Sequence, residues 1–303
     1  MLQKKKIRDI LRPMETFICN ECPNKCNVNR TTNVGICGVG VLPRVSRVGL
    51  HPWEEPVISG EKGSGTIFFA GCNLRCVFCQ NYQISHRLVG KTYTYRELAD
   101  AMRSLVDQGA HNINFVTPSH YAYAVERALA IYRPPVPVVY NSSAYDDVET
   151  LKRLEGLVDV YLPDYKYDDP NVAAKYSGAE DYPSVAWAAI AEMHRQQPRL
   201  VIEDGLMKKG LVVRHLVLPT MSTESKRIVE KLYNEYGDSI YLSVMSQYVP
   251  MGDAAAYPEI NRTLVPLEYT RVVAALNRLG ATNVFVQDAT AASDVYVPPF
   301  DGE

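Results

Sequence analysis

From Gly65 onward, short apolar runs rich in β-branched and aromatic residues alternate with amphipathic stretches of helical period. The apolar runs are continuous, which is typical of strands in a parallel sheet that is covered on both faces. The runs span residues 65–71, 112–118, 136–143, 157–166, 210–219, 239–248 and 283–288. This alternation predicts a right-handed β/α winding, as an open doubly wound sheet or as a full or partial barrel.

The stretches between these runs carry helix start and stop signals. Thr94 and Glu97 have the spacing of a capping box, and Asp146 and Glu149 repeat that spacing before a second helix. A third helical stretch ends at Gly280, a residue type favoured just after a helix. In each candidate architecture the chemistry is expected at the C-terminal ends of the strands.

The overall composition excludes several classes of function. The 303 residues are 47% hydrophobic and 22% charged, with a formal net charge of −2, so nothing predicts a surface for nucleic acid. No apolar run approaches the roughly 20 residues needed to cross a bilayer, so no membrane partner is expected. The basic stretch at residues 1–17 lacks the apolar segment of a signal peptide. We therefore expect a solvated arm or short helix there, and a cytoplasmic protein.

Four of the seven cysteines stand near the N-terminus, in a segment rich in Pro, Asn and Gly. Cys19, Cys22, Cys26 and Cys37 have spacings x2, x3 and x10, and their segment has no helix or strand periodicity. In a reducing compartment such a group indicates a metal site, for which zinc and a second iron–sulfur cluster are both open. We expect residues 1–50 to form an arm and a metal-binding extension, and residues 51–303 to form the core. Residues 43–65 are expected to be a loop-rich connector.

The other three cysteines lie in "GCNLRCVFCQ", directly after the first apolar run. Cys72, Cys76 and Cys79 have spacing x3 and x2, and no further cysteine follows them in the chain. Most structural zinc and iron–sulfur sites use four protein ligands, so this site borrows a ligand or leaves one position open. A zinc knuckle completed by a distant residue is one interpretation, and three unrelated buried cysteines another. The spacing in a loop after a strand favours an iron–sulfur site.

The CxxxCxxC spacing, with Phe78 before the third cysteine, resembles that of the radical S-adenosylmethionine (SAM) enzymes. The resemblance spans about residues 65–290 and implies a partial (β/α)6 barrel. It implies a [4Fe–4S] cluster held by Cys72, Cys76 and Cys79, with the fourth iron open to the amino and carboxylate groups of SAM. It further implies reductive cleavage of SAM to a 5′-deoxyadenosyl radical, and a reductant such as flavodoxin or ferredoxin.

Within that superfamily, two further stretches resemble the activating enzymes of glycyl radical enzymes, typified by pyruvate formate-lyase activating enzyme. By this resemblance, Lys166 in "VYLPDYK" pairs with the SAM carboxylate, and Asp164 orients SAM or holds a monovalent cation. Arg214 in "VRHLVLP" contacts the SAM carboxylate or ribose. Asn141 in "VYNSS" is a neutral residue at the place of that group's cation ligands. The simpler alternatives are a strand-end ion pair and an arginine paired with a surface acid.

"NFVTPSHY" stands where those activating enzymes have Gly-Gly-Glu, which binds the SAM amino group. The hydroxyl of Thr117 or Ser119 is expected to accept that ammonium instead. His120 is either a substrate-side acid or base or a structural histidine. The departure resembles a branch of activating-enzyme homologues that carries an N-terminal cysteine cluster.

The leading hypothesis is thus a radical SAM enzyme that abstracts hydrogen from an unidentified substrate. That substrate is either a glycine of a protein partner or another molecule or side chain. The alternative is a non-catalytic iron–sulfur protein that transfers electrons or senses redox state. Charged residues at the predicted strand ends, Asp164, Lys166 and Arg214, favour the enzyme.

Overall fold

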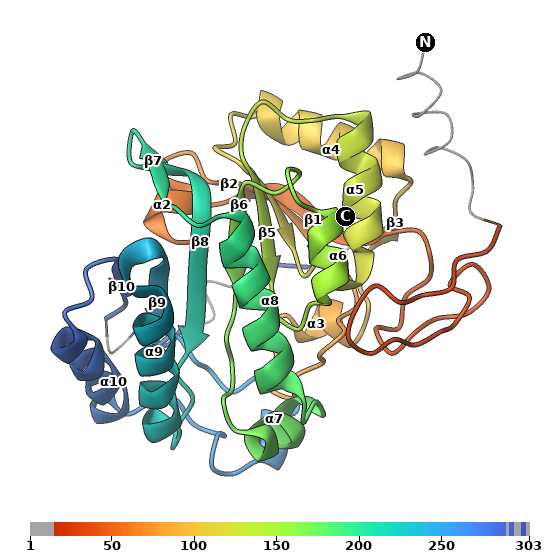
Figure 1. The fold of residues 1–303 in the computed structure, drawn as a ribbon. Coiled ribbons are helices and arrows are strands. Elements are labelled where there is room, and N and C mark those ends of the chain that lie inside the picture. Colours follow the sequence, from red (N-terminus) through yellow and green to blue (C-terminus); the bar gives the residue numbers. More distant parts are fainter. Residues whose placement is uncertain (1–14, 289–290, 294–297, 301–303) are drawn as a thin grey trace.

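The computed structural model describes residues 15–288, 291–293 and 298–300, and the expected N-terminal arm lies almost wholly outside this range. Its described strands form one sheet (Figure 1). In chain order they are β1 (Arg44–His51), β2 (Ser64–Phe69), β3 (Lys91–Thr92), β4 (Ile113–Val116), β5 (Val138–Ser142), β6 (Val160–Pro163), β7 (Val201–Glu203), β8 (Leu206–Leu216), β9 (Tyr241–Met245) and β10 (Val284–Val286).

The parallel part of the sheet runs in chain order, β2-β4-β5-β6-β8-β9-β10. These are the seven strands predicted from the apolar runs, and β2, β4, β5 and β6 are buried along their whole length. The order never reverses direction, which excludes the doubly wound alternative. Among the described residues, the end strands β10 and β3 are not paired with each other, so the sheet is open and not a closed barrel.

Helices cover the outer face of the sheet (Figure 1). Leu98 and Met102 of one helix, for example, pack against Ile67 and Phe115 of β2 and β4. The helices are α2 (Pro56–Ser59), α3 (Tyr82–Ser85), α4 (Tyr95–Asp107), α5 (Ala122–Ile131), α6 (Val148–Arg153), α7 (Pro170–Ser177), α8 (Tyr182–Gln196), α9 (Ser222–Tyr236) and α10 (Pro266–Leu279), with 3₁₀ turns at Ser119–Tyr121, Gly237–Ser239 and Ala254–Ala256. None of these described helices is long and apolar enough to cross a membrane.

The short helix α2 covers the inner face of the sheet near the N-terminal ends of the strands. Its Ile58 packs with Val139, Leu162 and Val212, which come from β5, β6 and β8. Successive strand side chains point to opposite faces, so Asn141 and Arg214 share this inner face with Val139 and Val212. The inner face is therefore apolar near α2 and polar toward the C-terminal strand ends.

The prediction of a loop-rich connector at residues 43–65 is wrong, because this segment contains β1 and α2. β1 pairs antiparallel with β2 across most of its length, from Val45 opposite Phe69 to His51 opposite Ser64. A register shift between Val45 and Arg47 interrupts the pairing. Such a bulge breaks the period-two alternation that would identify a strand from sequence. β1 also extends from residue 44 to 51, across the division expected between extension and core.

Two of the three helix ends are confirmed. Thr94 and Glu97 make a reciprocal capping box at α4, and Gly280 follows α10 in the left-handed conformation. The capping box expected from Asp146 is wrong, since the N-cap of α6 is Asp147, whose side chain accepts from the Thr150 amide. Asp146 is instead buried against β5, where it accepts hydrogen bonds from Tyr140 and Ser142.

Candidate active site

The three-cysteine loop begins at the C-terminal end of β2. Cys72 and Cys76 are buried and Cys79 is half-buried, and all three are free thiols. The loop turns at Gly71, whose φ of 82° is in the left-handed region. A Cβ at this glycine would lie 2.6 Å from the carbonyl oxygen of Cys37, so the N-terminal cysteine segment packs directly against the start of the loop.

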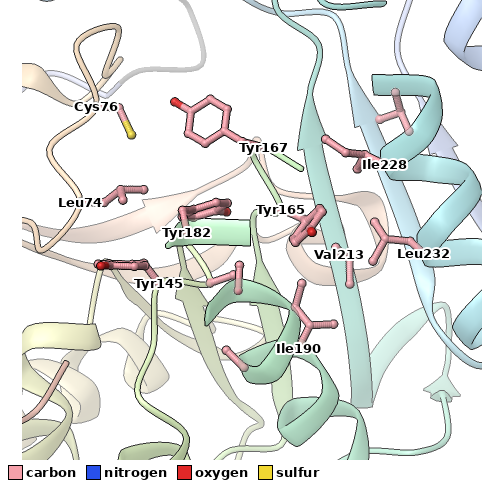
Figure 2. Close-up of a cluster of buried hydrophobic side chains, with 14 of the residues drawn as sticks. Leu74, Cys76, Tyr145, Tyr165, Tyr167, Tyr182, Ile190, Val213, Ile228 and Leu232 are labelled. Atoms are coloured by element: carbon pink, nitrogen blue, oxygen red, sulfur yellow. The ribbon is translucent and has the colours of Figure 1, made fainter. Parts of the chain in front are cut away.

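Each cysteine sulfur of the loop accepts a hydrogen bond. The Leu74 amide donates to Cys72 Sγ at 3.4 Å, Ser177 Oγ donates to Cys76 Sγ at 3.0 Å, and Ser85 Oγ donates to Cys79 Sγ at 3.3 Å. The hydroxyl end of Tyr167 extends toward Cys76 (Figure 2) and lies 2.9 Å from Ser177 Oγ. Donors that face a sulfur stabilise its thiolate form.

Burial and nearby charges set the pKa values of the thiols in this loop. Burial raises the pKa of the Cys72 thiol and raises that of Cys79 to about 12, and the neighbouring cysteines add to both shifts. Lys166 lies close enough to oppose these shifts. The thiols of Cys72 and Cys79 are therefore held in the protonated form unless a metal-bearing group binds them as thiolates. Three sulfurs in one buried loop, each with a donor, fit an iron–sulfur cluster.

Beside the loop, Arg214 of β8 is the centre of a buried polar network. Its Nε donates to Asp164 Oδ1 at 2.8 Å, its Nη1 to Glu54 Oε2 at 3.0 Å, and its Nη2 to Asn141 Oδ1 at 2.6 Å. Asn114 and Asn141 each donate a side-chain amide hydrogen to Glu54 Oε1, at 2.9 and 3.2 Å. The Arg214 side chain is only 14% exposed, so this network satisfies a charge that would be costly if unpaired.

Lys166 joins the network through Asp164, with Nζ 2.8 Å from Oδ2. Burial opposes ionisation of Asp164, but Arg214 and Lys166 outweigh it and lower the pKa of its carboxyl. Burial likewise opposes the charge of Lys166, but Asp164 and the Cys76 sulfur raise its pKa. Tyr182 braces both residues, because its hydroxyl donates to the Asp164 carbonyl and accepts from the Lys166 amide.

Glu54 was missed by the sequence analysis. Its side chain is 7% exposed and comes from the segment between β1 and α2. Two adjacent acids just before Pro56 read as an ordinary exposed helix start, where acids are favoured. The available signal was indirect: the basic residue expected in the core at position 214 needs an acidic partner, and Asp164 already faces Lys166.

The remaining predicted SAM-site residues lie at the same strand ends. The Thr117 amide donates to the Asn141 carbonyl at 2.8 Å, and Thr117 has a φ of 58°. His120 is 1% exposed and its Nε2 lies 2.9 Å from the Ala70 carbonyl oxygen. Burial lowers the pKa of His120 to about 3, so the structure supports the structural role for this histidine rather than an acid–base one.

The four N-terminal cysteines lie in loops that contact the three-cysteine loop. Cys19, Cys22 and Cys37 are buried, Cys26 is half-buried, and none forms a disulfide. Burial raises the pKa of Cys22 to about 12, and the other three cysteines of the group raise it further. Asn24 bridges the two groups, since its side chain donates to the Asn73 carbonyl at 2.7 Å.

In the described part of the chain, no three His, Cys, Asp or Glu side chains are placed to hold one metal ion. A lone zinc ion needs four ligands at about 2.0 to 2.3 Å. A [4Fe–4S] cube is a larger body that holds its ligand sulfurs farther apart.

A comparison with protein families decides the assignment. Residues 66–232, from β2 to the middle of α9, match the Radical SAM superfamily. The chain belongs to the radical SAM superfamily. The family relationship confirms the general identification as a radical SAM protein and supports catalytic activity, and the family implies a [4Fe–4S] cluster and SAM.

Two other proteins resemble this chain, one in sequence and one in fold. The uncharacterised protein MJ0674 of Methanocaldococcus jannaschii is 32% identical over 255 residues, covering 81% of this chain and 70% of that protein. SuiB of Streptococcus suis, in a crystal structure with bound S-adenosylmethionine, superposes on 72% of this chain with a TM-score of 0.52 at 12% identity. This chain spans 48% of SuiB, so the likeness concerns the fold alone.

A cavity of about 380 Å³ opens beside the end of the three-cysteine loop. Gln80, which follows Cys79, lines it together with Tyr82 and Arg87 on one side and Asp253 and Phe300 on another. The cavity is adjacent to the cysteine loop but does not include the Arg214 network. Its described lining includes Gln80 but none of the three cysteines.

Proposed function

We propose that this radical SAM protein binds SAM between the three-cysteine loop and the Asp164–Lys166 pair, and uses it to abstract hydrogen from a substrate. The observation that carries the proposal is the position of Lys166. Its ammonium is held by Asp164 at 2.8 Å, and its charge acts on the sulfurs of Cys76 and Cys79. A fixed cation at the edge of the cysteine loop is placed to bind the carboxylate of an amino acid.

The chemistry divides between the cofactor and the chain. A reduced [4Fe–4S] cluster supplies the electron that cleaves SAM. Cys72, Cys76 and Cys79 would hold that cluster, and Lys166 would bind and orient the SAM carboxylate. The hydroxyl of Thr117 lies at a neighbouring strand end, where it would accept a hydrogen bond from the SAM ammonium, and Asn141, whose Oδ1 accepts from Arg214, would help to hold the site. Burial of these groups excludes water, which strengthens each of these interactions.

The test is an anaerobic turnover assay. The protein is reconstituted with iron and sulfide, reduced with dithionite and incubated with SAM, and 5′-deoxyadenosine is measured by mass spectrometry. A variant with Cys72, Cys76 and Cys79 changed to Ala is the control. We expect product only from the native protein. A fully reconstituted native protein that makes none would favour a non-catalytic electron-transfer or redox-sensing role.

The narrower form of the proposal concerns the substrate. The pair Asp164 and Lys166 and the sequence around Arg214 support a relative of the glycyl-radical activating enzymes, whose substrate is a glycine in a protein loop. The open cavity beside Cys79 offers a way in for such a loop. A glycyl radical signal in electron paramagnetic resonance (EPR) spectra of a candidate partner, formed only with SAM and the reduced protein, would support this form. Absence of that signal despite SAM cleavage would favour a different substrate.

The four N-terminal cysteines are proposed to hold a second metal, either zinc or a second [4Fe–4S] cluster. Their support is four free thiols in one compact group, three of them buried. The test is the iron and zinc content of anaerobically prepared protein that lacks Cys72, Cys76 and Cys79. Retained zinc indicates a zinc site, and retained iron with sulfide indicates a cluster. Loss of all bound metal would contradict both.

A further inference from the structure

We propose that Glu54 is a positioning residue of the SAM site, which holds Arg214 in place so that Asp164 and Lys166 keep the geometry that binds SAM. This inference rests on the proposed function. It assigns different tasks to the two basic residues at the strand ends: Lys166 contacts SAM, and Arg214 is a brace. The sequence comparison with activating enzymes implies instead that Arg214 itself contacts SAM.

The hydrogen bonds of Arg214 support the brace. Each of its three guanidinium nitrogens already donates to a side chain, namely Asp164, Glu54 and Asn141. Three of the five guanidinium donors are thus engaged in a site where both Arg214 and Glu54 are largely buried, so the guanidinium is held in one orientation. Displacement of a buried carboxylate from its cation leaves an unpaired charge, which is strongly unfavourable.

Lys166 is differently placed. Within the described part of the chain its ammonium donates one hydrogen bond, to Asp164, and an ammonium has three donors. Its charge also acts on the sulfurs of Cys76 and Cys79, as that of Arg214 does not in the same measure. Lys166 is therefore the basic residue of the network whose charge acts on the cysteine sulfurs.

Glu54 is the residue that makes this division possible. Arg214 and Lys166 bring two positive charges to a single carboxylate, Asp164. Glu54, beside the neighbouring buried Glu55, gives Arg214 an anionic partner other than Asp164, and Asp164 keeps its second oxygen for Lys166. Asn114 and Asn141 fix the Glu54 carboxylate by donating to its other oxygen.

The substitution Glu54→Gln tests this role at constant side-chain shape. A Gln amide cannot accept from the two asparagines with its oxygen and from Arg214 with its nitrogen, so one donor must face another. We expect the affinity of the cluster-loaded protein for SAM, measured by equilibrium dialysis, to fall roughly 10-fold to 100-fold, as for supporting residues of metal sites. Glu54→Asp keeps the charge and is expected to retain more of the affinity than Glu54→Gln.

Glu268→Gln is the matched control. Glu268 is also a largely buried carboxylate paired with an arginine, Arg262 at 2.7 Å, but it caps α10 away from the network. Both Gln variants are expected to lower the thermal unfolding midpoint, whereas only Glu54→Gln is expected to weaken SAM binding. If Glu54→Gln folds and binds SAM within twofold of the native protein, the inference is overturned. If Glu54→Gln does not fold, the SAM affinities of Glu54→Asp and Arg214→Lys decide. Native-like SAM affinity in both of these variants would count against the bracing role.

Failure of the proposed function is a separate outcome. A native, cluster-loaded protein that does not bind SAM would overturn the proposed function and this inference together. If the native protein binds SAM but Glu54→Gln and Glu268→Gln lose SAM affinity equally, only this inference is overturned. The loss of affinity would then follow the loss of stability and not the position of the carboxylate.

Discussion

Nη1 of Arg214 lies 3.0 Å from Oε2 of Glu54, although the two residues are 160 positions apart in the chain. The contact joins the segment before α2 to the C-terminal part of β8, beneath the strand ends that carry the proposed SAM site. It turns a pair of strand-end charges into a closed network with two acids and two bases, in which Asp164 is shared. The chemistry of the site thus depends on a residue that no local motif contains.

Lys166→Met is expected to abolish tight SAM binding, because it removes the cation at the edge of the cysteine loop while keeping the length of the side chain. Loss of one partner from a buried charge pair typically costs about 2 kcal/mol or more. Isothermal titration of the cluster-loaded protein measures the effect. The control is Lys175→Met, since Lys175 pairs with Glu259 and is half exposed. Equal SAM affinities in the two variants would contradict the role of Lys166.

Ser177→Ala is expected to lower the reduction potential of the bound cluster. Ser177 Oγ donates to Cys76 Sγ at 3.0 Å, and such hydrogen bonds favour the more negative, reduced state. A redox titration followed by EPR measures the midpoint potential without any turnover. Ser184→Ala is the control, because the Ser184 hydroxyl donates to the Asp181 carbonyl at the start of its own helix. A potential unchanged in Ser177→Ala, or shifted equally in both variants, would count against this contact.

Gly71→Ala is expected to impair cluster incorporation. A methyl group there would lie 2.6 Å from the Cys37 carbonyl oxygen, in addition to the left-handed strain of about 1 to 2 kcal/mol. Gly156→Ala isolates the strain, since Gly156 has a φ of 77° and no neighbour within 4 Å of a Cβ. Iron content after anaerobic reconstitution should therefore fall in Gly71→Ala and stay near native in Gly156→Ala. Similar iron in both would show that the packing of Cys37 on Gly71 is unimportant.

His215→Gln is expected to make the free energy of unfolding depend less steeply on pH in the acid range. Burial lowers the pKa of His215 to about 4, from an ordinary value of 6.5, so the folded protein resists a proton that the unfolded chain accepts. Its stabilising effect is complete above pH 6.5 and is lost as the pH falls toward 4, by up to about 1.4 kcal/mol per pH unit. Urea unfolding at several pH values measures the slope. An identical slope in native and variant protein would refute a neutral buried histidine.

Local chemistry made much of the fold and the cysteine site predictable. The seven parallel strands followed from continuous apolar runs, because a strand buried on both faces must be apolar along its length. The start of α4 followed from Thr94 and Glu97, whose capping bonds form within one turn. The position of the three-cysteine loop at the C-terminal end of β2 followed from the cysteine spacing together with the apolar run before it, because both signals are local in the sequence.

Only the tertiary structure decided which distant groups share the buried inner face. The acids Asp146 and Asp147 are adjacent and chemically alike, yet one is buried under Tyr140 and the other caps α6. Glu54 reads as a surface acid until the sheet brings Arg214 to it. Burial and pairing depend on residues far apart in the chain, so a window of sequence carries the chemistry of each group but not its partner. The partner becomes definite only when the sheet and α2 enclose it, because a buried charge must be compensated there.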